Sequence, residues 1–150
     1  VAEVARAFGA KVIYYSASGA PAQEGYEQVD FETLLTQSDI ISVHAPLNEH
    51  TEGLINSKAF EKMRSSCIFL NLGRGPIVDE QALYNALVRN QIAAAGLDVL
   101  CEEPMSADNP LVQFKDSKRL LITPHIAWAS VEARTHLMEI IHGQVKDFFA

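Results

Sequence analysis

Short apolar runs alternate with amphipathic stretches along the 150 residues, and this alternation restricts the possible folds more than any other feature. Each run is long enough for a buried strand, and the stretches between them carry apolar residues at helical spacing. Strands and helices that alternate in this way favour a mostly parallel sheet. We therefore predict an α/β fold with a doubly wound, mostly parallel sheet and strands at about 11–15, 39–43, 67–72, 92–99 and 120–122.

Five helices are expected, at 1–8, 31–37, about 57–63, 80–88 and about 130–149. Asp30 and Asp79 precede two of them and can cap the first turn with their carboxylates. Asn56 or Ser57 can do the same for the third helix. Gly9 follows the first helix, as glycine often does just past a helix end. The helical boundaries are therefore marked by side-chain chemistry as well as by periodicity.

The composition of the chain limits the classes of partner that it is expected to bind. The chain is 48% hydrophobic and 21% charged, as in ordinary globular proteins, and its net charge of −7 comes without a basic cluster. We expect neither a nucleic-acid nor a membrane partner, and no run is long enough to span a bilayer. Two cysteines are too few for a disulfide scaffold, and Cys67 lies in an apolar run as a small buried thiol. A cytoplasmic location is expected.

Metal binding and serine hydrolase chemistry have no support in the sequence. His50, His136 and His142 form no metal-ligand spacing with cysteines or carboxylates, so no metal site is expected. No serine lies in a Gly-x-Ser-x-Gly motif.

Three polar residues each follow an apolar run: Arg74, Glu103 and His125. Open α/β sheets bind ligands at the carboxyl ends of their strands, so these side chains are candidates for one site. An arginine fork suits a carboxylate, and an imidazole with a carboxylate partner suits proton transfer. Each residue also has a plainer interpretation: an arginine paired with a local acid, a loop histidine bonded to backbone, and a solvated glutamate.

Two other strand ends carry candidate ligand-binding residues. Asp98 ends an apolar strand and needs a partner there, either a ligand amide or a backbone turn. The segment 44–47 ends another strand and can form a backbone wall beside a bound ring, where Thr51 can reach the same ligand.

Four segments form a recognisable set: Ser38–Leu47, Phe69–Gly75, Gly96–Val99 with Glu102–Pro104, and Thr123–Ala127. Together they resemble the cofactor domain of the NAD-dependent D-2-hydroxyacid dehydrogenases, which implies a Rossmann-like sheet. They occur in the family's order and at its spacing, and the resemblance extends over nearly the whole chain. Trp128, which follows the last segment, resembles the glycerate dehydrogenase or hydroxypyruvate reductase branch of the family.

The resemblance implies a role for each candidate residue. Arg74 would hold the carboxylate and carbonyl of a 2-keto acid, His125 would exchange a proton with the substrate oxygen, and Glu103 would pair with His125. Asp98 would bind near the nicotinamide amide. The implied cofactor-binding residues are Ser16, His44, Ala45, Pro46, Thr51, Leu72, Gly73, Arg74, Asp98, His125 and Ala127.

Two departures from the family pattern modify this expectation. The Gly-x-Gly-x-x-Gly turn, the first strand and the substrate domain are all expected before Val1. We therefore expect residues 1–150 to be an N-terminally truncated dinucleotide-binding domain without a substrate domain, and to have little activity alone. Ser16 replaces the acid that usually binds the adenosine ribose, so NADP is not excluded. No arginine follows in that loop to hold a 2′-phosphate, which favours NAD.

Two alternative hypotheses belong to other classes. A non-catalytic nucleotide-binding or interaction module derived from this family would not need Arg74, Glu103 and His125 together. A response-regulator-like domain lacks the acidic cluster expected after its first strand. The leading expectation is an oxidoreductase acting on D-2-hydroxyacids, with a small 2-hydroxy or 2-keto acid as partner and a possible homodimer, as is usual in the family.

Overall fold

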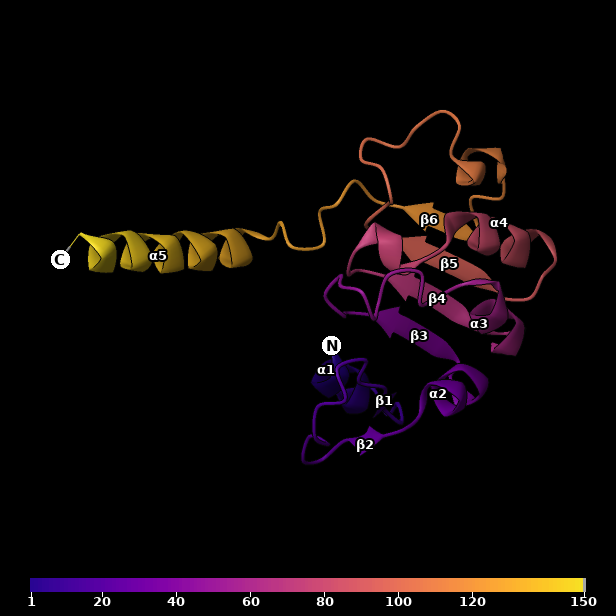
Figure 1. Cartoon of the computed structure of the whole chain (residues 1–150), viewed down its shortest axis with the longest axis horizontal. Helices are drawn as coiled ribbons and strands as arrows, with labels where there is room; N and C mark the ends of the chain where they lie inside the picture. Colours follow the sequence, from indigo (N-terminus) through magenta and orange to yellow (C-terminus); the bar gives the residue numbers. More distant parts are fainter. Residues whose placement is uncertain (150) are drawn as a thin grey trace.

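A parallel sheet forms the centre of the molecule. The computed structural model describes residues 1–149, and residue 150, the last of the expected domain, lies outside them. Hydrogen-bonded strands follow one another in chain order, all parallel (Figure 1): β3 (Ile40–Val43), β4 (Ile68–Asn71), β5 (Ala94–Leu97) and β6 (Leu120–Ile122). A second, two-stranded parallel sheet consists of β1 (Ile13–Tyr14) and β2 (Glu27–Gln28). The predicted α/β architecture is confirmed.

The five expected helices are present, with ends within about two residues of the prediction. They are α1 (Ala2–Ala7), α2 (Phe31–Gln37), α3 (Ser57–Lys62), α4 (Glu80–Val88) and α5 (Val131–Phe148). Asp30, Asn56 and Asp79 accept hydrogen bonds from first-turn amides, as predicted. The sequence did not reveal β2 or the two 3₁₀ turns, η1 (Gly75–Ile77) and η2 (Pro110–Gln113). Such short elements contain too few residues to show a periodicity.

One face of the four-stranded sheet packs against α2, α3 and α4. Alternate strand residues, such as Ile41 and Val43 in β3, point into this core, which excludes water. Phe60 of α3 and Phe69 of β4 are both fully buried and meet edge to face, with ring centroids 5.5 Å apart. The opposite face is partly open, because Ile40 and Leu121 remain 60% and 65% exposed.

The two sheets are not hydrogen-bonded to each other. The Rossmann strand order places the first strand between the second and the fourth, which correspond here to β1 and β3. The interruption between β1 and β3 therefore falls where the Rossmann order has its first strand.

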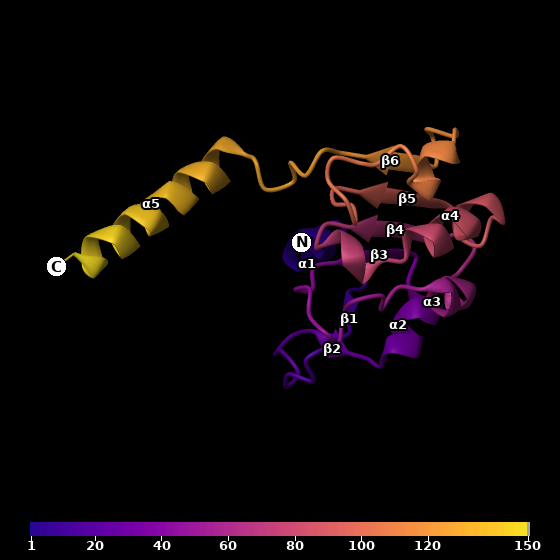
Figure 2. The ribbon, with the colours of Figure 1, turned by 45° about the horizontal axis from the view of Figure 1, so that its top comes forward.

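Helix α5 stands away from the rest of the molecule. Figures 1 and 2 show it at the end of an extended segment that leaves β6, and none of its side chains is buried. No helix among residues 1–149 combines the length and apolar character needed to cross a bilayer.

The helix caps give a direct test of this packing. Asp79 caps α4, whose inner face contributes Leu83 and Leu87 to the core. We expect Asp79→Ala to lower the free energy of unfolding by about 1 kcal/mol, because the Ala82 amide loses its acceptor. Urea denaturation followed by far-UV circular dichroism measures this. Ser130→Ala, which removes the cap of the unburied α5, is the matched control and should leave the core transition in place; equal losses in both variants would contradict this account.

Candidate active site

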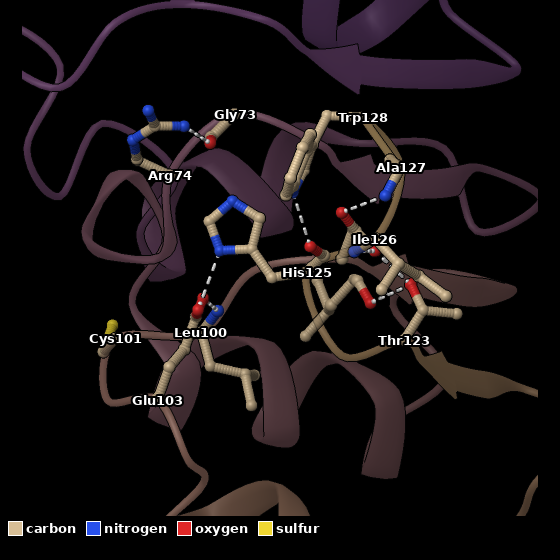
Figure 3. A network of polar contacts seen from close by, with 12 residues as sticks. Gly73, Arg74, Leu100, Cys101, Glu103, Thr123, His125, Ile126, Ala127 and Trp128 are labelled. Carbon is tan, nitrogen blue, oxygen red and sulfur yellow. Dashed lines mark hydrogen bonds and ion pairs between the residues drawn. The ribbon is translucent and has the colours of Figure 1, made fainter. Parts of the chain in front are cut away.

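The three polar residues that follow β4, β5 and β6 lie at the carboxyl edge of the sheet. Because these strands are parallel neighbours, their carboxyl ends point the same way, and the loops that follow them meet. Figure 3 shows Arg74, Glu103 and His125 on these loops. The structure thus brings the trio to one region, as the strand pattern predicts.

Glu103 and His125 form a direct pair. Glu103 Oε2 lies 2.8 Å from His125 Nδ1, and each side chain is 38% exposed. Glu103 Oε1 accepts a hydrogen bond from the Leu100 amide at 2.9 Å, which fixes the direction of the carboxylate. The pKa of Glu103 is lowered, mainly by this amide hydrogen bond and secondly by the hydrogen bond with His125. Glu103 is therefore a carboxylate at neutral pH, and the pairing at Nδ1 leaves Nε2 of His125 available for a ligand.

Arg74 has no acidic partner among residues 1–149. Its side chain is exposed, and Nη1 donates to the carbonyl of the preceding Gly73 at 2.8 Å. The alternative of an arginine paired with a local Asp or Glu is therefore not observed in the described chain. The remaining donors of the guanidinium fork are free for an anionic group.

The turn that carries Arg74 is held by a buried side chain. Asn71 is only 1% exposed; its Oδ1 accepts from the Gly73 amide at 3.1 Å, and its Nδ2 donates to the Arg74 carbonyl at 3.0 Å. This role of Asn71 was not predicted, although a polar residue that ends an apolar strand was the available signal.

Gly75 brings this turn into contact with the loop of Glu103. A Cβ atom on Gly75 would lie 2.0 Å from the carbonyl carbon of Leu100, so only glycine fits. Leu100 is also the residue whose amide orients Glu103. The position of Arg74 is thus coupled through backbone packing to that of Glu103, a role for Gly75 that the sequence did not reveal.

Asp98 holds the turn that contains His125 in place. It is 3% exposed, and its carboxylate accepts hydrogen bonds from the Thr123 hydroxyl and from the amides of Ile126 and Ala127. Burial raises the pKa of Asp98, but these hydrogen bonds and the nearby His125 outweigh burial, and the pKa is lowered overall. Of the two partners that the sequence allows for Asp98, a ligand amide and a backbone turn, the structure shows the backbone turn.

Segment 44–47, where a backbone wall beside a bound ring was expected, contacts the turn after β4. A Cβ atom on Gly73 would lie 3.1 Å from the Ala45 carbonyl oxygen, so the loops after β3 and β4 touch. Gly73 is itself buried, whereas Leu72, beside it, is 39% exposed. The wall beside a bound ring stays a prediction.

The other expected cofactor residues make contacts within their own loops. Thr51 is 1% exposed and donates its hydroxyl to the Pro46 carbonyl at 2.7 Å, so it braces the loop after β3. The His44 ring nitrogen Nε2 lies 2.8 Å from the Ser42 hydroxyl.

Ser16 lies in the loop after β1, where its hydroxyl is 3.1 Å from that of Ser18. No group of three or more His, Cys, Asp or Glu side chains among residues 1–149 is placed to hold a metal ion.

Comparison with known proteins identifies the family. A family model described as the NAD binding domain of D-isomer specific 2-hydroxyacid dehydrogenases matches residues 1–127. The chain belongs to this family. A hydroxypyruvate reductase of Blautia hydrogenotrophica is 43% identical over 148 residues, covering 97% of this chain and 45% of the relative. A glycerate dehydrogenase of Methylorubrum extorquens is 41% identical, covering 100% of this chain and 46% of the relative.

Solved structures of dehydrogenases share the fold. The D-lactate dehydrogenase of Aquifex aeolicus, complexed with NAD and lactic acid, superposes with a TM-score of 0.89 at 29% identity, covering 99% of this chain and 49% of that one. An NADPH-dependent glyoxylate/hydroxypyruvate reductase of Sinorhizobium meliloti, in complex with NADP and malonate, gives 0.87 at 28% identity, covering 99% and 46%. The chain spans about half the length of the curated relatives it matches.

The close contact at Gly75 leads to a stability prediction. We expect Gly75→Ala to lower the free energy of unfolding by about 1–3 kcal/mol, because the new methyl group must displace the Leu100 backbone. Thermal and urea denaturation measure the loss. Gly143→Ala is the control: nothing lies within 4 Å of a Cβ there, and alanine favours the α5 helix. A neutral Gly75→Ala variant would show that the two loops are not in contact.

The buried Asp98 carboxylate predicts an acid-dependent contribution to stability. Its folded pKa lies below the unfolded value of about 3.9, so its contribution is complete above that pH and is lost as the pH falls through the lower, folded value. We expect Asp98→Asn to cost about 1–3 kcal/mol at pH 7, since an amide donor would face backbone donors. Urea denaturation at pH 7 and pH 3 should show a smaller acid loss in the variant than in the parent; equal acid losses would contradict the assignment.

Proposed function

We propose that this chain forms the cofactor-binding part of an NAD-dependent enzyme that interconverts 2-keto acids and D-2-hydroxyacids, with hydroxypyruvate and glyoxylate as substrates. The observation that carries the proposal is the 2.8 Å Glu103–His125 pair at the sheet edge that also presents the uncommitted guanidinium of Arg74. A cation for the substrate carboxylate and a proton carrier for its oxygen are what this reaction requires.

In this scheme each of the three side chains has a defined role. Arg74 binds the substrate carboxylate through its fork and polarises the adjacent carbonyl. His125, protonated and held at Nδ1 by Glu103, gives the Nε2 proton to the carbonyl oxygen as that oxygen becomes an alkoxide. Glu103 stabilises the imidazolium and keeps the ring in orientation. Bound NADH supplies the hydride, and the protein supplies alignment and charge stabilisation.

The cofactor would lie beside the loops after β3 and β4, at Ala45, Pro46 and the exposed Leu72. The contact of Gly73 with Ala45 would hold these two loops together. The proposed binding residues are Ser16, His44, Ala45, Pro46, Leu72, Gly73, Arg74, His125 and Ala127, with the buried Thr51 and Asp98 contributing by holding the loops that carry them.

The remaining parts of the enzyme are proposed from the relatives. Because the chain spans about half of their length, we propose that a substrate domain and a phosphate-binding turn belong to the rest of the protein. A homodimer and a cytoplasmic location are further expectations from the family. The 150 residues alone should therefore oxidise NADH only weakly with hydroxypyruvate, glyoxylate or pyruvate; robust turnover by the isolated chain would refute this arrangement.

A chimera tests the catalytic assignment. The chain replaces the corresponding segment of the Blautia hydroxypyruvate reductase, which supplies the missing parts. We expect His125→Ala to lower kcat about 10²–10⁴-fold while the Kd for NADH stays unchanged, because general acid–base catalysis is lost. His136→Ala, whose side chain is 74% exposed on α5, is the matched control.

Two outcomes of the chimera experiment would redirect the assignment. Equal losses of turnover and cofactor affinity in His125→Ala would make His125 a structural residue. A folded parent chimera that binds NADH without turnover would favour the non-catalytic nucleotide-binding module.

Cofactor preference has its own test at Ser16. The segment 16–26 contains no Arg or Lys to bind a 2′-phosphate, which supports NAD, but Ser16 stands at the strand end where an acid is expected to bind the ribose. We expect Ser16→Asp in the chimera to increase the ratio of kcat/KM for NADH over NADPH, because the new carboxylate accepts from the ribose hydroxyl and repels the phosphate. Ser117→Asp, the same change at an exposed serine in the loop before β6, is the control. An unchanged ratio would place the adenosine ribose elsewhere.

A further inference from the structure

His125 has an unusual backbone conformation for a residue that carries chemistry. Its φ is +56°, in the left-handed region, which non-glycine residues adopt uncommonly, although Asn, Asp and His do so more often than most. Among the described non-glycine residues, Asn90 is the other with positive φ, and asparagine tolerates it more readily. Surrounding contacts must therefore hold His125 in place, since an unconstrained histidine would relax.

Both peptide groups of His125 are fixed. The His125 amide donates to the Thr123 carbonyl at 3.0 Å, which fixes the preceding peptide. The following peptide is held at both of its ends: its carbonyl, on His125, accepts from Trp128 Nε1 at 2.9 Å, and its amide, on Ile126, donates to Asp98 at 2.9 Å. Rotation of this peptide would have to break both bonds. These contacts therefore restrain φ and ψ of His125 together.

Trp128 makes the more exposed of the two hydrogen bonds that hold the peptide after His125. Asp98 is a buried carboxylate, whereas Trp128 is 52% exposed, so burial alone does not explain the orientation of the indole. The indole nitrogen is a donor only, and its partner here is the carbonyl on which the left-handed turn depends. Figure 3 shows the Trp128 ring joined to the His125 carbonyl while the imidazole is joined to Glu103.

We propose that Trp128 is a positioning residue for His125: with Asp98 it clamps the peptide after His125 and thereby aims the imidazole at Glu103. The catalytic consequence rests on the proposed function, but the conformational claim concerns this chain alone. Trp128 is the one tryptophan among the 150 residues, so its indole signals are unambiguous.

NMR of the 150-residue chain at constant pH tests the clamp. A left-handed residue gives a strong nuclear Overhauser effect between its own amide and α protons, and the imidazole ¹⁵N signals report whether Nδ1 keeps one partner. Trp128→Phe keeps an aromatic ring but removes the donor. We expect this variant to lose the strong effect at His125 and the single set of imidazole signals. Val131→Ala, 65% exposed three residues further along, is the matched control and should retain both.

Two results would overturn the proposal. One is a folded Trp128→Phe variant with parental signals at His125. The other needs no variant, and so applies even if Trp128→Phe does not fold: solvent-like hydrogen exchange of the indole N–H in the parent chain would show that it is not held. Neither readout requires turnover, so an inactive chimera would refute the proposed function and leave this inference standing.

Discussion

Asp98 connects the three loops on which the site depends. Its backbone amide donates to the carbonyl of Asn71 at the end of β4, at 3.0 Å. Its carboxylate holds the Thr123 hydroxyl and the amides of Ile126 and Ala127, in the segment after β6. A buried carboxylate is stable only when its oxygens are satisfied, so these partners are required for folding as well as useful for function. Asp98, which directly follows β5, thereby fixes the ends of both neighbouring strands, β4 and β6.

The contacts extend from Asp98 to each candidate catalytic residue. Asn71, held by Asp98, in turn holds the turn of Arg74. Gly75 packs that turn against Leu100, whose amide orients Glu103. Since a polar network of this kind is rigid only when each member has its partner, a change at one loop is felt at the others. The Arg74 guanidinium, by contrast, is left with free donors, as a group that binds an external anion must be.

Much of this arrangement was accessible from local sequence patterns. The strands and helices were predicted because apolar runs and caps such as Asp30 and Asp79 are local signals. The trio was predicted because parallel strands end at a common edge. β2 was missed because two residues, Glu27 and Gln28, carry no periodic signal. Their strand character comes from pairing with β1, a contact that local pattern does not encode.

The sequence by itself determined the α/β class through its periodicity, the candidate site residues through their strand-end positions, and the family through the resemblance of four segments. Only the tertiary structure decided how those residues are held. The partner of Asp98, the left-handed conformation of His125 and the grip of Trp128 on its carbonyl all depend on hydrogen bonds whose geometry is set when β5 and β6 pair and the loop after β6 folds. Residue types specify which donors and acceptors exist, and chain folding specifies which of them meet.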